Sequence, residues 1–347
     1  MNIKEINKFI EENKLPKFRL KQILKAVYQD HVSAFSEIST LPKELREKMD
    51  KELNILSFEP EEIQSDKKDG SQKVLLKLSD ANFIETVLMP GVNDNHWTAC
   101  ISSQVGCAMA CAFCATGKMG LKRNLTYEEI IDQVLFWKQY LAKNRPGDTL
   151  ANIVYMGMGE PFMNWDEVSK SIHKLLDESL FNFSARHISV STSGIADKIK
   201  RFAKEFPQLN LAISLIFPND KDRSEYMPVN KRFDLRELSQ AINYYLMTTN
   251  RKIFFEYVLF DGINDQEENA KELVNFIKHI EKKQLVHINL IRYNTTESKF
   301  KSSSKEATTA FQKYLTKYKI FSTIRKSIGG EINAACGQLA GRVDDKK

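Results

Sequence analysis

The chain of 347 residues is poor in the residues that fibrous and disordered proteins contain in excess. It has only 14 Gly and 9 Pro, and it shows no internal repeat or low-complexity tract. These counts exclude a collagen-like, low-complexity or wholly disordered chain. Hydrophobic residues make up 42% of the sequence. That is enough for one large domain with an appendage, or for two ordinary domains.

The sequence also lacks the apolar segments that direct a chain to a membrane. Its first fifteen residues, MNIKEINKFIEENKL, mix charges throughout and contain no apolar signal-peptide core. No later apolar run approaches the ~18 residues that a membrane-spanning helix needs. We therefore predict a cytoplasmic protein that does not associate with a membrane.

The sequence has many residues of both charges, and its surplus of positive charge is small. Lys and Arg together number 51 against 45 Asp and Glu, a formal charge of +6, and the isoelectric point is near 8.8. Such a surplus permits a polyanionic partner, but one spread evenly over the surface would serve only solubility.

Cysteine is rare but clustered. Four of the five cysteines fall within fifteen residues, and three of these form C-x-x-x-C-x-x-C: the cluster is Cys100, Cys107, Cys111 and Cys114, and the fifth is Cys336. An odd number of cysteines in a reducing compartment argues against a disulfide framework. The clustered thiols therefore bind a ligand or react.

Two metal centres fit three thiolates at this spacing. A structural zinc site needs four closed ligands, and only His96 or Cys100 lies near enough in sequence to be the fourth. An electron-transfer [4Fe–4S] cluster uses four cysteines, whereas three leave one iron open to bind a substrate. The pattern favours a catalytic cluster over an electron carrier.

The order of predicted segments indicates an α/β fold. Residues 1–60 look helical, and two strands at 73–79 and 83–90 flank a polar turn at 80–82. Later strands, dense in apolar and β-branched residues, are predicted at 152–157, 187–192, 210–215, 253–260, 287–293 and 321–327. Helices are predicted between them at 166–180, 196–206, 235–246 and 266–283. Repeated β-α units of this size imply a parallel sheet, open or curled toward a barrel, with strands buried on both faces.

Polar residues follow several of these strands. They lie at 157–160, at 191–194, at Ser214 and at Asn294. In parallel sheets the chemistry gathers at the carboxyl ends of the strands. Each group alone is typical of a turn, but four of them on one rim beside a metal motif predict a ligand site.

The N-terminal region contains an amphipathic helix with one basic face. Residues 17–28 have the apolar spacing of such a helix. Its other face, with Lys17, Arg19, Lys21 and Lys25, is either a solvated surface or a groove for RNA phosphates. A second helix is predicted through residues 42–53, with Thr40 as its cap.

The cysteine motif at the start of a β/α array resembles that of the radical S-adenosylmethionine (SAM) enzymes. The match narrows to the RlmN/Cfr family of RNA adenine methyltransferases and extends from residue 17 to residue 342. The motifs that carry it are CISSQVGCAMACAFCATGKMGLKRNLT, MGMGEP, STSG, AISL, NLIRYN and EINAACGQLAG.

The resemblance implies a partial (β/α) barrel of the radical SAM type. It implies a helical, RNA-binding N-terminal domain at 1–60, a β-hairpin region at 61–97 and a radical SAM core at 98–300. The C-terminal extension at 301–347 would carry a methyl-carrier cysteine.

The same resemblance assigns chemistry to the cysteines. Cys107, Cys111 and Cys114 would bind a [4Fe–4S] cluster, whose open iron chelates SAM and yields a 5′-deoxyadenosyl radical. Cys336 would take a methyl group from a first SAM, and the radical from a second would activate that methyl group. Cys100 would release the product through a transient disulfide, and Glu85 corresponds to the family's proposed proton acceptor.

The resemblance also implies a set of SAM contacts. They are Gly159, Glu160, Ser191, Ser214, Leu215, Ile216 and Asn294. Ile216 departs from the family because a His is common there, so a side-chain contact from that His is absent. Arg292 and Tyr293 stand where many members have Pro-Trp, which is closer to the carbon-8 branch. Pro161 and the pair at 105–106 resemble the carbon-2 branch, which we favour.

The implied substrates are an adenosine of 23S rRNA, in the peptidyl transferase centre, and tRNA beside the anticodon. The implied electron donor is a reductant such as flavodoxin or ferredoxin, and the protein would act as a monomer. Two other classes remain open: a radical SAM activase or iron–sulfur carrier acting on protein, and a zinc-containing RNA-binding module without catalysis.

Overall fold

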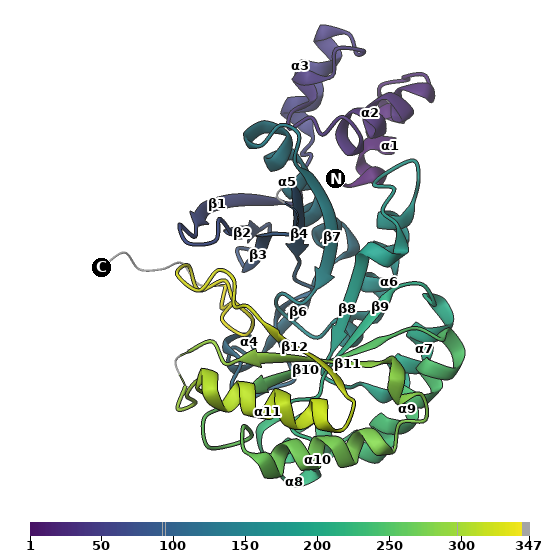
Figure 1. Ribbon diagram of the computed structural model, residues 1–347. Coiled ribbons are helices and arrows are strands. Elements are labelled where there is room, and N and C mark those ends of the chain that lie inside the picture. Colours follow the sequence, from purple (N-terminus) through teal and green to yellow (C-terminus); the bar gives the residue numbers. More distant parts are fainter. Residues whose placement is uncertain (92, 94, 297, 342–347) are drawn as a thin grey trace.

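A computed structural model describes residues 1–91, 93, 95–296 and 298–341. Arg342, the last residue of the motif resemblance, lies outside the described residues. N-terminal helices form one end of the molecule, a β-hairpin region lies beside them, and a curled sheet with outer helices forms the other end (Figure 1). No helix in the described part of the chain is long and apolar enough to cross a membrane.

One sheet of ten strands forms the core, in the order β1-β2-β3-β4-β7-β8-β9-β10-β11-β12. The strands β1 (Phe58–Ser65), β2 (Gln72–Leu78), β3 (Phe83–Pro90) and β4 (His96–Cys100) pair antiparallel. From β4 onward all neighbours are parallel: β7 (Thr149–Tyr155), β8 (Ile188–Thr192), β9 (Asn210–Ser214), β10 (Ile253–Leu259), β11 (Val286–Arg292) and β12 (Phe321–Arg325). The sheet does not close on itself, so the predicted partial barrel is confirmed.

Helices cover the outer face of the parallel strands. They are α5 (Tyr127–Asn144), α6 (Trp165–Leu176), α7 (Ala196–Glu205), α9 (Leu235–Thr249), α10 (Glu267–Lys278) and α11 (Lys305–Lys317), with the short α8 (Asp220–Tyr226) between β9 and α9. The prediction that α10 extends to residue 283 was wrong. Tighter i→i−3 bonds from His279 to Phe276 and from Ile280 to Ile277 end the helix earlier.

The sequence suggested that all parallel strands are buried on both faces, and the structure shows this for only some of them. β9 and β11 each contain three consecutive buried residues. Along β8 and β10, buried residues alternate with half-buried ones. The buried residues pack under the helices, while the others face the inside of the curled sheet. This inner face is polar enough to hold a ligand, because it carries Ser189, Ser191 and Glu256.

The N-terminal helices pack against α5 and the loop after α6. They are α1 (Ile3–Glu12), α2 (Phe18–Tyr28) and α3 (Lys43–Glu52), with a 3₁₀ turn, η1 (Phe35–Glu37), before α3. The Tyr28 and Phe181 rings meet edge to face at 4.9 Å, and Gln139 of α5 donates to the Val32 carbonyl at 2.7 Å. The predicted cap Thr40 was wrong, because Pro42 is the residue that precedes the first turn of α3.

Candidate active site

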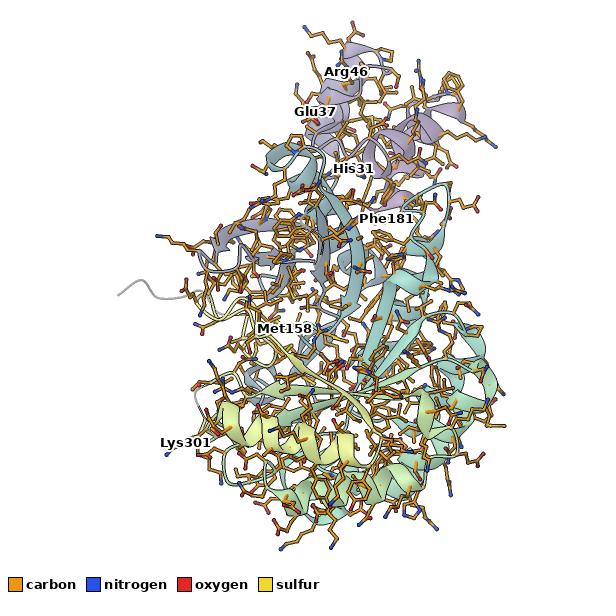
Figure 2. The ribbon with its side chains drawn as sticks, in the orientation of Figure 1. His31, Glu37, Arg46, Met158, Phe181 and Lys301 are labelled. Atoms are coloured by element: carbon orange, nitrogen blue, oxygen red, sulfur yellow. The ribbon has the colours of Figure 1, made fainter. Side chains whose placement is uncertain are left out.

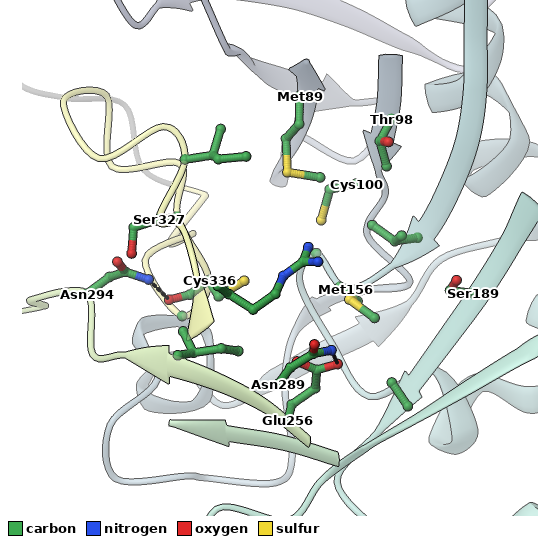
Figure 3. A pocket seen from close by; sticks show the side chains of 18 of the residues that line it. Met89, Thr98, Cys100, Met156, Ser189, Glu256, Asn289, Asn294, Ser327 and Cys336 are labelled. Atoms are coloured by element: carbon green, nitrogen blue, oxygen red, sulfur yellow. Dashed lines mark hydrogen bonds between the residues drawn. The ribbon is translucent and has the colours of Figure 1, made fainter. Parts of the chain in front are cut away.

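A cavity of about 360 Å³ lies at the open side of the sheet. Cys100 at the end of β4 and Cys336 in the C-terminal segment both line it, together with Cys114 and Asn294 (Figure 3). Cys100 and Asn294 lie at the carboxyl ends of the parallel strands β4 and β11, the kind of position where the sequence predicted a site, whereas Cys114 and Cys336 reach the cavity from loops. Two thiols 236 positions apart in sequence thus share one cavity.

The three motif cysteines follow the short strand β5 (Gln104–Gly106), which pairs with β6 (Leu121–Asn124). The Cys107 amide donates to the Gly120 carbonyl at 3.0 Å, and the Cys114 amide donates to Cys111 at 3.1 Å. Gly106 has φ +75°, and a Cβ there would lie 1.8 Å from the Gly120 carbonyl oxygen. The loop is therefore held in a close turn that only glycine permits.

The pKa values of Cys107 and Cys111 are raised by burial first and by the charges of neighbouring groups second. Burial raises the pKa of Cys107 to about 12, with further contributions from Glu160 and Cys114. Burial also raises the pKa of Cys111, with Cys114 and Cys107 next in effect. Within the described ranges, no group of three or more His, Cys, Asp or Glu side chains is arranged closely enough to hold a metal ion. Three soft thiolate donors on one loop suit an iron–sulfur cluster, which would stabilise the ionised thiols.

Gly159 and Glu160 form the loop after β7. The Glu160 side chain accepts hydrogen bonds from the Ser193 amide at 2.7 Å and the Phe162 amide at 3.0 Å. It is buried, and desolvation raises its pKa. Gly159 has φ +99°, and a Cβ there would lie 2.6 Å from the Gln104 Cβ. This loop is packed tightly against the cysteine-motif region.

The other expected SAM contacts lie at the ends of neighbouring strands. Ser191 is on β8, Ser214 ends β9, and Leu215 and Ile216 follow it as buried residues. Ile216 has φ +54°, a left-handed conformation that β-branched residues rarely adopt. Of the predicted SAM contacts, only Asn294 lines the cavity with Cys336, and it donates to the Cys336 carbonyl at 3.3 Å.

The segment that carries Cys336 is tied to the cysteine-motif helix α4 (Ala115–Lys118). The Ala115 amide donates to the Gly337 carbonyl at 2.9 Å, and the Thr116 hydroxyl donates to the Leu339 carbonyl at 2.6 Å. Burial raises the pKa of Cys100, and the charge of Cys336 adds to that effect. Cys336 is exposed at the cavity, but the protein around it desolvates the thiol and raises its pKa, with Glu256 adding to the effect. The two thiols are therefore electrostatic neighbours.

Glu85 lies on β3, outside the residues that line this cavity. Its carboxylate pairs with Lys73 at 2.9 Å and accepts from the Ala340 amide at 2.6 Å and the Gly341 amide at 2.9 Å. All these groups are buried or half-buried. The proton-acceptor role implied for Glu85 stays a prediction.

Sequence reasoning missed Arg223. This fully buried side chain donates to the Ser193 carbonyl at 2.5 Å and to the Ser214 carbonyl at 3.1 Å, and it also contacts the Leu215 carbonyl. It therefore links the ends of β8 and β9. Burial lowers its pKa to about 10, so it stays charged at neutral pH. Nothing in the polar stretch 219–226 marks this arginine as buried.

Three further cavity residues were also missed: Glu256, Asn289 and Arg325. Asn289 donates to the Glu256 carboxylate at 2.8 Å across β10 and β11 (Figure 3). Burial raises the pKa of Glu256, and the same carboxylate faces the charge of Arg325. A signal was available for Glu256 and Asn289, which interrupt mostly apolar strands, but not for Arg325, which ends the short polar strand β12.

Comparisons with known proteins agree with this geometry. The radical SAM superfamily profile matches residues 101–274, and the ribosomal RNA large subunit methyltransferase N-terminal domain matches residues 1–55. A dual-specificity RNA methyltransferase RlmN of Syntrophus aciditrophicus is 40% identical over 100% of this chain and 97% of that protein. A ribosomal RNA large subunit methyltransferase Cfr of Bacillus velezensis is 38% identical over 99% and 97%.

A solved structure extends the likeness to three dimensions. The crystal structure of a radical SAM methyltransferase from Sphaerobacter thermophilus superposes with a TM-score of 0.89 and 39% sequence identity. It covers 99% of this chain, and this chain covers 98% of it. The arrangement of the helices, the hairpin region and the curled sheet is thus shared over the whole length.

Proposed function

Because the chain belongs to the RlmN/Cfr family of radical SAM methyltransferases, we propose that it methylates carbon 2 of an adenosine in the peptidyl transferase centre of 23S rRNA. The same reaction extends to tRNA beside the anticodon. The protein acts as a monomer in the cytoplasm and takes electrons from a reductant such as flavodoxin or ferredoxin.

The observation that carries the proposal is the shared cavity of Cys100 and Cys336. Carbon 2 of adenine is electron-poor and carries no acidic proton, so it cannot attack the methyl group of SAM directly. A methyl group loaded on one protein thiol, with a second thiol in reach to release the product, avoids that barrier. A zinc-binding module could use Cys100 as a fourth ligand, but neither it nor an electron carrier would need Cys336.

The chain supplies the groups that this chemistry requires. Cys107, Cys111 and Cys114 would hold the [4Fe–4S] cluster of the family, which with SAM supplies a radical able to abstract hydrogen. Cys336 carries the methyl group on sulfur. Once the S-methyl carbon, after loss of a hydrogen atom, has bonded to carbon 2, the base gives up the proton of carbon 2 and one electron, which the cluster would take back. The Cys100 thiolate then attacks the Cys336 sulfur: a sulfur–sulfur bond forms, the carbon–sulfur bond breaks, and its electron pair stays on the former methyl carbon, which takes up a proton. The cell's thiol reductants reopen the disulfide.

The expected SAM contacts have matching chemistry. The Glu160 carboxylate is a charge-assisted acceptor for the SAM ammonium. Gly159, Ser191, Ser214, Leu215, Ile216 and Asn294 form the rest of the SAM pocket. Glu85 serves as the proton acceptor when the C-terminal segment moves away from it. A general base must first come within hydrogen-bond reach of its proton.

Carbon 8 is the second candidate position, and two residues favour it. Arg292 and Tyr293 precede Asn294 as in the carbon-8 branch, and the Tyr293 hydroxyl contacts the Phe113 carbonyl behind the cysteine motif at 3.4 Å. Pro161 opens a 3₁₀ turn that positions Glu160, as in the carbon-2 branch. The pair Val105-Gly106 also resembles the carbon-2 branch, which is why we favour carbon 2.

Mass spectrometry of rRNA and tRNA digests tests the proposal. Cells that express the gene should contain 2-methyladenosine that cells lacking it do not. A signal for 8-methyladenosine in its place would establish the second candidate, and an unchanged digest would exclude both.

A Cys336→Ala variant separates this function from a radical SAM activase. The carrier mechanism predicts no methylated base, while the cluster signal and SAM binding persist. Full product formation by the variant would exclude a carrier role for this thiol.

A further inference from the structure

Three carboxylates of the hairpin region hold the backbone of the C-terminal segment. Asp69 accepts from the Gly329 amide at 2.8 Å, and Asp66 accepts from the Glu331 amide at 3.0 Å. Glu85 holds the far side of the segment through the amides of residues 340 and 341. Figure 1 shows the C-terminal segment returning beside β1–β3. These bonds flank Cys336 on both sides along the chain.

Asp66 and Asp69 belong to the turn between β1 and β2, and the turn is preformed. The second oxygen of Asp66 accepts from the Lys68 amide at 2.8 Å, and that of Asp69 accepts from the Ser71 amide at 2.9 Å and its hydroxyl at 2.5 Å. Each aspartate thus uses one oxygen to fix its own turn and the other to hold the C-terminal segment.

The charge state of Asp69 suits this role. Desolvation alone would raise its pKa, but hydrogen bonds from Ser71 and Gly329 and the nearby charge of Lys326 hold the pKa below its usual value. A carboxylate accepting backbone N–H groups makes stronger bonds than a neutral acceptor. The segment it holds has no helix or strand between residues 329 and 341, so its position depends on individual contacts. The aspartates supply those before Cys336, and α4 supplies those after it.

We propose that the β1–β2 turn is a clamp that positions Cys336 at the cavity, with Asp66 and Asp69 as positioning residues that touch neither SAM nor RNA. This role rests on the proposed carrier function of Cys336, which needs its sulfur to reach a methyl donor, a base and Cys100 in turn. The clamp fixes the N-terminal side of the loop at residues 329 and 331. Cys336 and the residues after it stay free to change partners, including Glu85.

The Asp69→Asn variant tests the clamp. Asparagine has one acceptor oxygen, so it can satisfy Ser71 or Gly329 but not both. Asp177→Asn is a matched control, because Asp177 accepts from the Ser179 amide at 2.9 Å and its hydroxyl at 2.6 Å. It makes the same turn as Asp69, yet it has no bond to the C-terminal segment among those found in the described chain.

Three measurements on the full-length, cluster-loaded protein under anaerobic conditions report on the clamp. Asp69→Asn should exchange the amide hydrogens of residues 329 and 331 about tenfold faster, as expected for the loss of a charged hydrogen bond. Alkylation of Cys336 by iodoacetamide should speed up similarly. The kcat for methylation of a 23S rRNA fragment should fall about tenfold, with the KM for SAM unchanged. Asp177→Asn should match the wild type in all three.

The possible outcomes distinguish a failure of the clamp proposal from a failure of the proposed methyltransferase function. Unchanged exchange and alkylation in Asp69→Asn overturn the clamp, whatever happens to activity. Faster exchange with an unchanged kcat overturns its role in positioning. A wild-type protein that methylates no RNA, while exchange still differs between the variants, overturns the proposed function and leaves the clamp standing as a structural contact.

Discussion

At the scale of single residues, the least expected feature is a fully buried arginine that makes no ion pair among the described residues. Arg223 instead donates to three backbone carbonyls at the ends of β8 and β9, the strands that carry Ser191 and Ser214. Its planar fork of donors can satisfy carbonyls on two strands at once, which a lysine ammonium cannot do. Arg223 therefore sets the spacing between the two strand ends.

Replacing Arg223 by lysine should consequently weaken SAM binding. We expect the dissociation constant for SAM, measured calorimetrically on the reconstituted protein, to rise about tenfold. The free energy of unfolding should fall by about 1–3 kcal/mol, because carbonyls lose their partners. Arg232→Lys is the control, because Arg232 is exposed and lies over the Phe233 ring. An unchanged SAM affinity in Arg223→Lys would show that the strand spacing has another cause.

Burial lowers the pKa of His31 to about 4, and the neighbouring charge of Lys138 contributes, while Asp30 opposes them. His31 lies between the N-terminal helices and α5 (Figure 2), where its ring nitrogen is 3.3 Å from the Lys138 ammonium. Below pH 6.5 the unfolded chain takes up a proton that the folded protein does not. Stability is therefore lost as the pH falls from about 6.5 toward 4.

The variant His31→Asn should remove part of this acid sensitivity. His31 has φ +58°, which asparagine tolerates better than most residues, so the backbone need not change. We expect wild type and variant to differ little in melting temperature at pH 7.5, and the variant to lose less between pH 6.5 and 5. If the melting temperatures of wild type and variant fell by the same amount between pH 6.5 and 5, His31 would not be a source of the acid sensitivity.

These residues show what the sequence could reveal about the site. The cysteine motif and the polar ends of the strands were identifiable because chemistry and spacing coincide in short segments. Glu256 and Asn289 could have been found, since a charged or amide side chain inside an apolar strand must face something polar. Arg223 could not, because its partners are backbone carbonyls that leave no trace in the pattern of side chains.

At the scale of secondary-structure elements, the loop between β7 and the 3₁₀ turn η2 (Pro161–Asn164) is the most constrained part of the expected SAM site. Gly159 combines a positive φ with a close approach to Gln104. A side chain there would push the loop, and with it Glu160, away from the amide of Ser193.

Gly159→Ala should therefore weaken SAM binding, with a loss of more than tenfold in affinity, while the protein stays folded. The matched control is Gly262→Ala, because Gly262 also has a positive φ, +67°, but a Cβ added there would have no atom within 4 Å. Both variants carry the cost of an alanine at positive φ, about 1 kcal/mol. The difference between their SAM affinities thus measures the crowding at Gly159, and equal affinities would refute it.

Among the elements, apolar periodicity located the parallel strands from β7 to β12 and the outer helices α6, α7 and α9, but it did not identify the outer helix α5. The predicted strand at 210–215, for example, is β9 (Asn210–Ser214). The sequence did not show β4, because its five residues include His96 and Thr98 and are too short for a clear pattern. It also gave the wrong cap for α3, since the side chain of Thr40 lies too far before Pro42 to reach the first free amides.

At the scale of the whole molecule, contacts that span most of the chain assemble the site. Asp66 meets Glu331 and Thr116 meets Leu339, so the hairpin region, the cysteine motif and the C-terminal segment converge. Such pairings depend on how the sheet curls, which no local pattern encodes. The family resemblance implied roles for Cys100 and Cys336, but it did not indicate which residues contact the segment around Cys336.

The N-terminal helices form a second unit, and an aromatic contact is one of several interactions that attach it to α5 and the loop after α6. Phe181 is 5% exposed and packs edge to face on Tyr28 (Figure 2), and removing a buried phenylalanine ring costs about 3–5 kcal/mol. Phe181→Ala should detach the helices locally, so that amides of α2 exchange hydrogen at least tenfold faster. If these helices bind RNA as proposed, the KM for the RNA substrate should rise while SAM binding stays unchanged.

Phe276→Ala, which removes a buried ring from α10 instead, should lower global stability without selective exchange in α2. An unchanged RNA KM after the helices have loosened would exclude them from RNA binding.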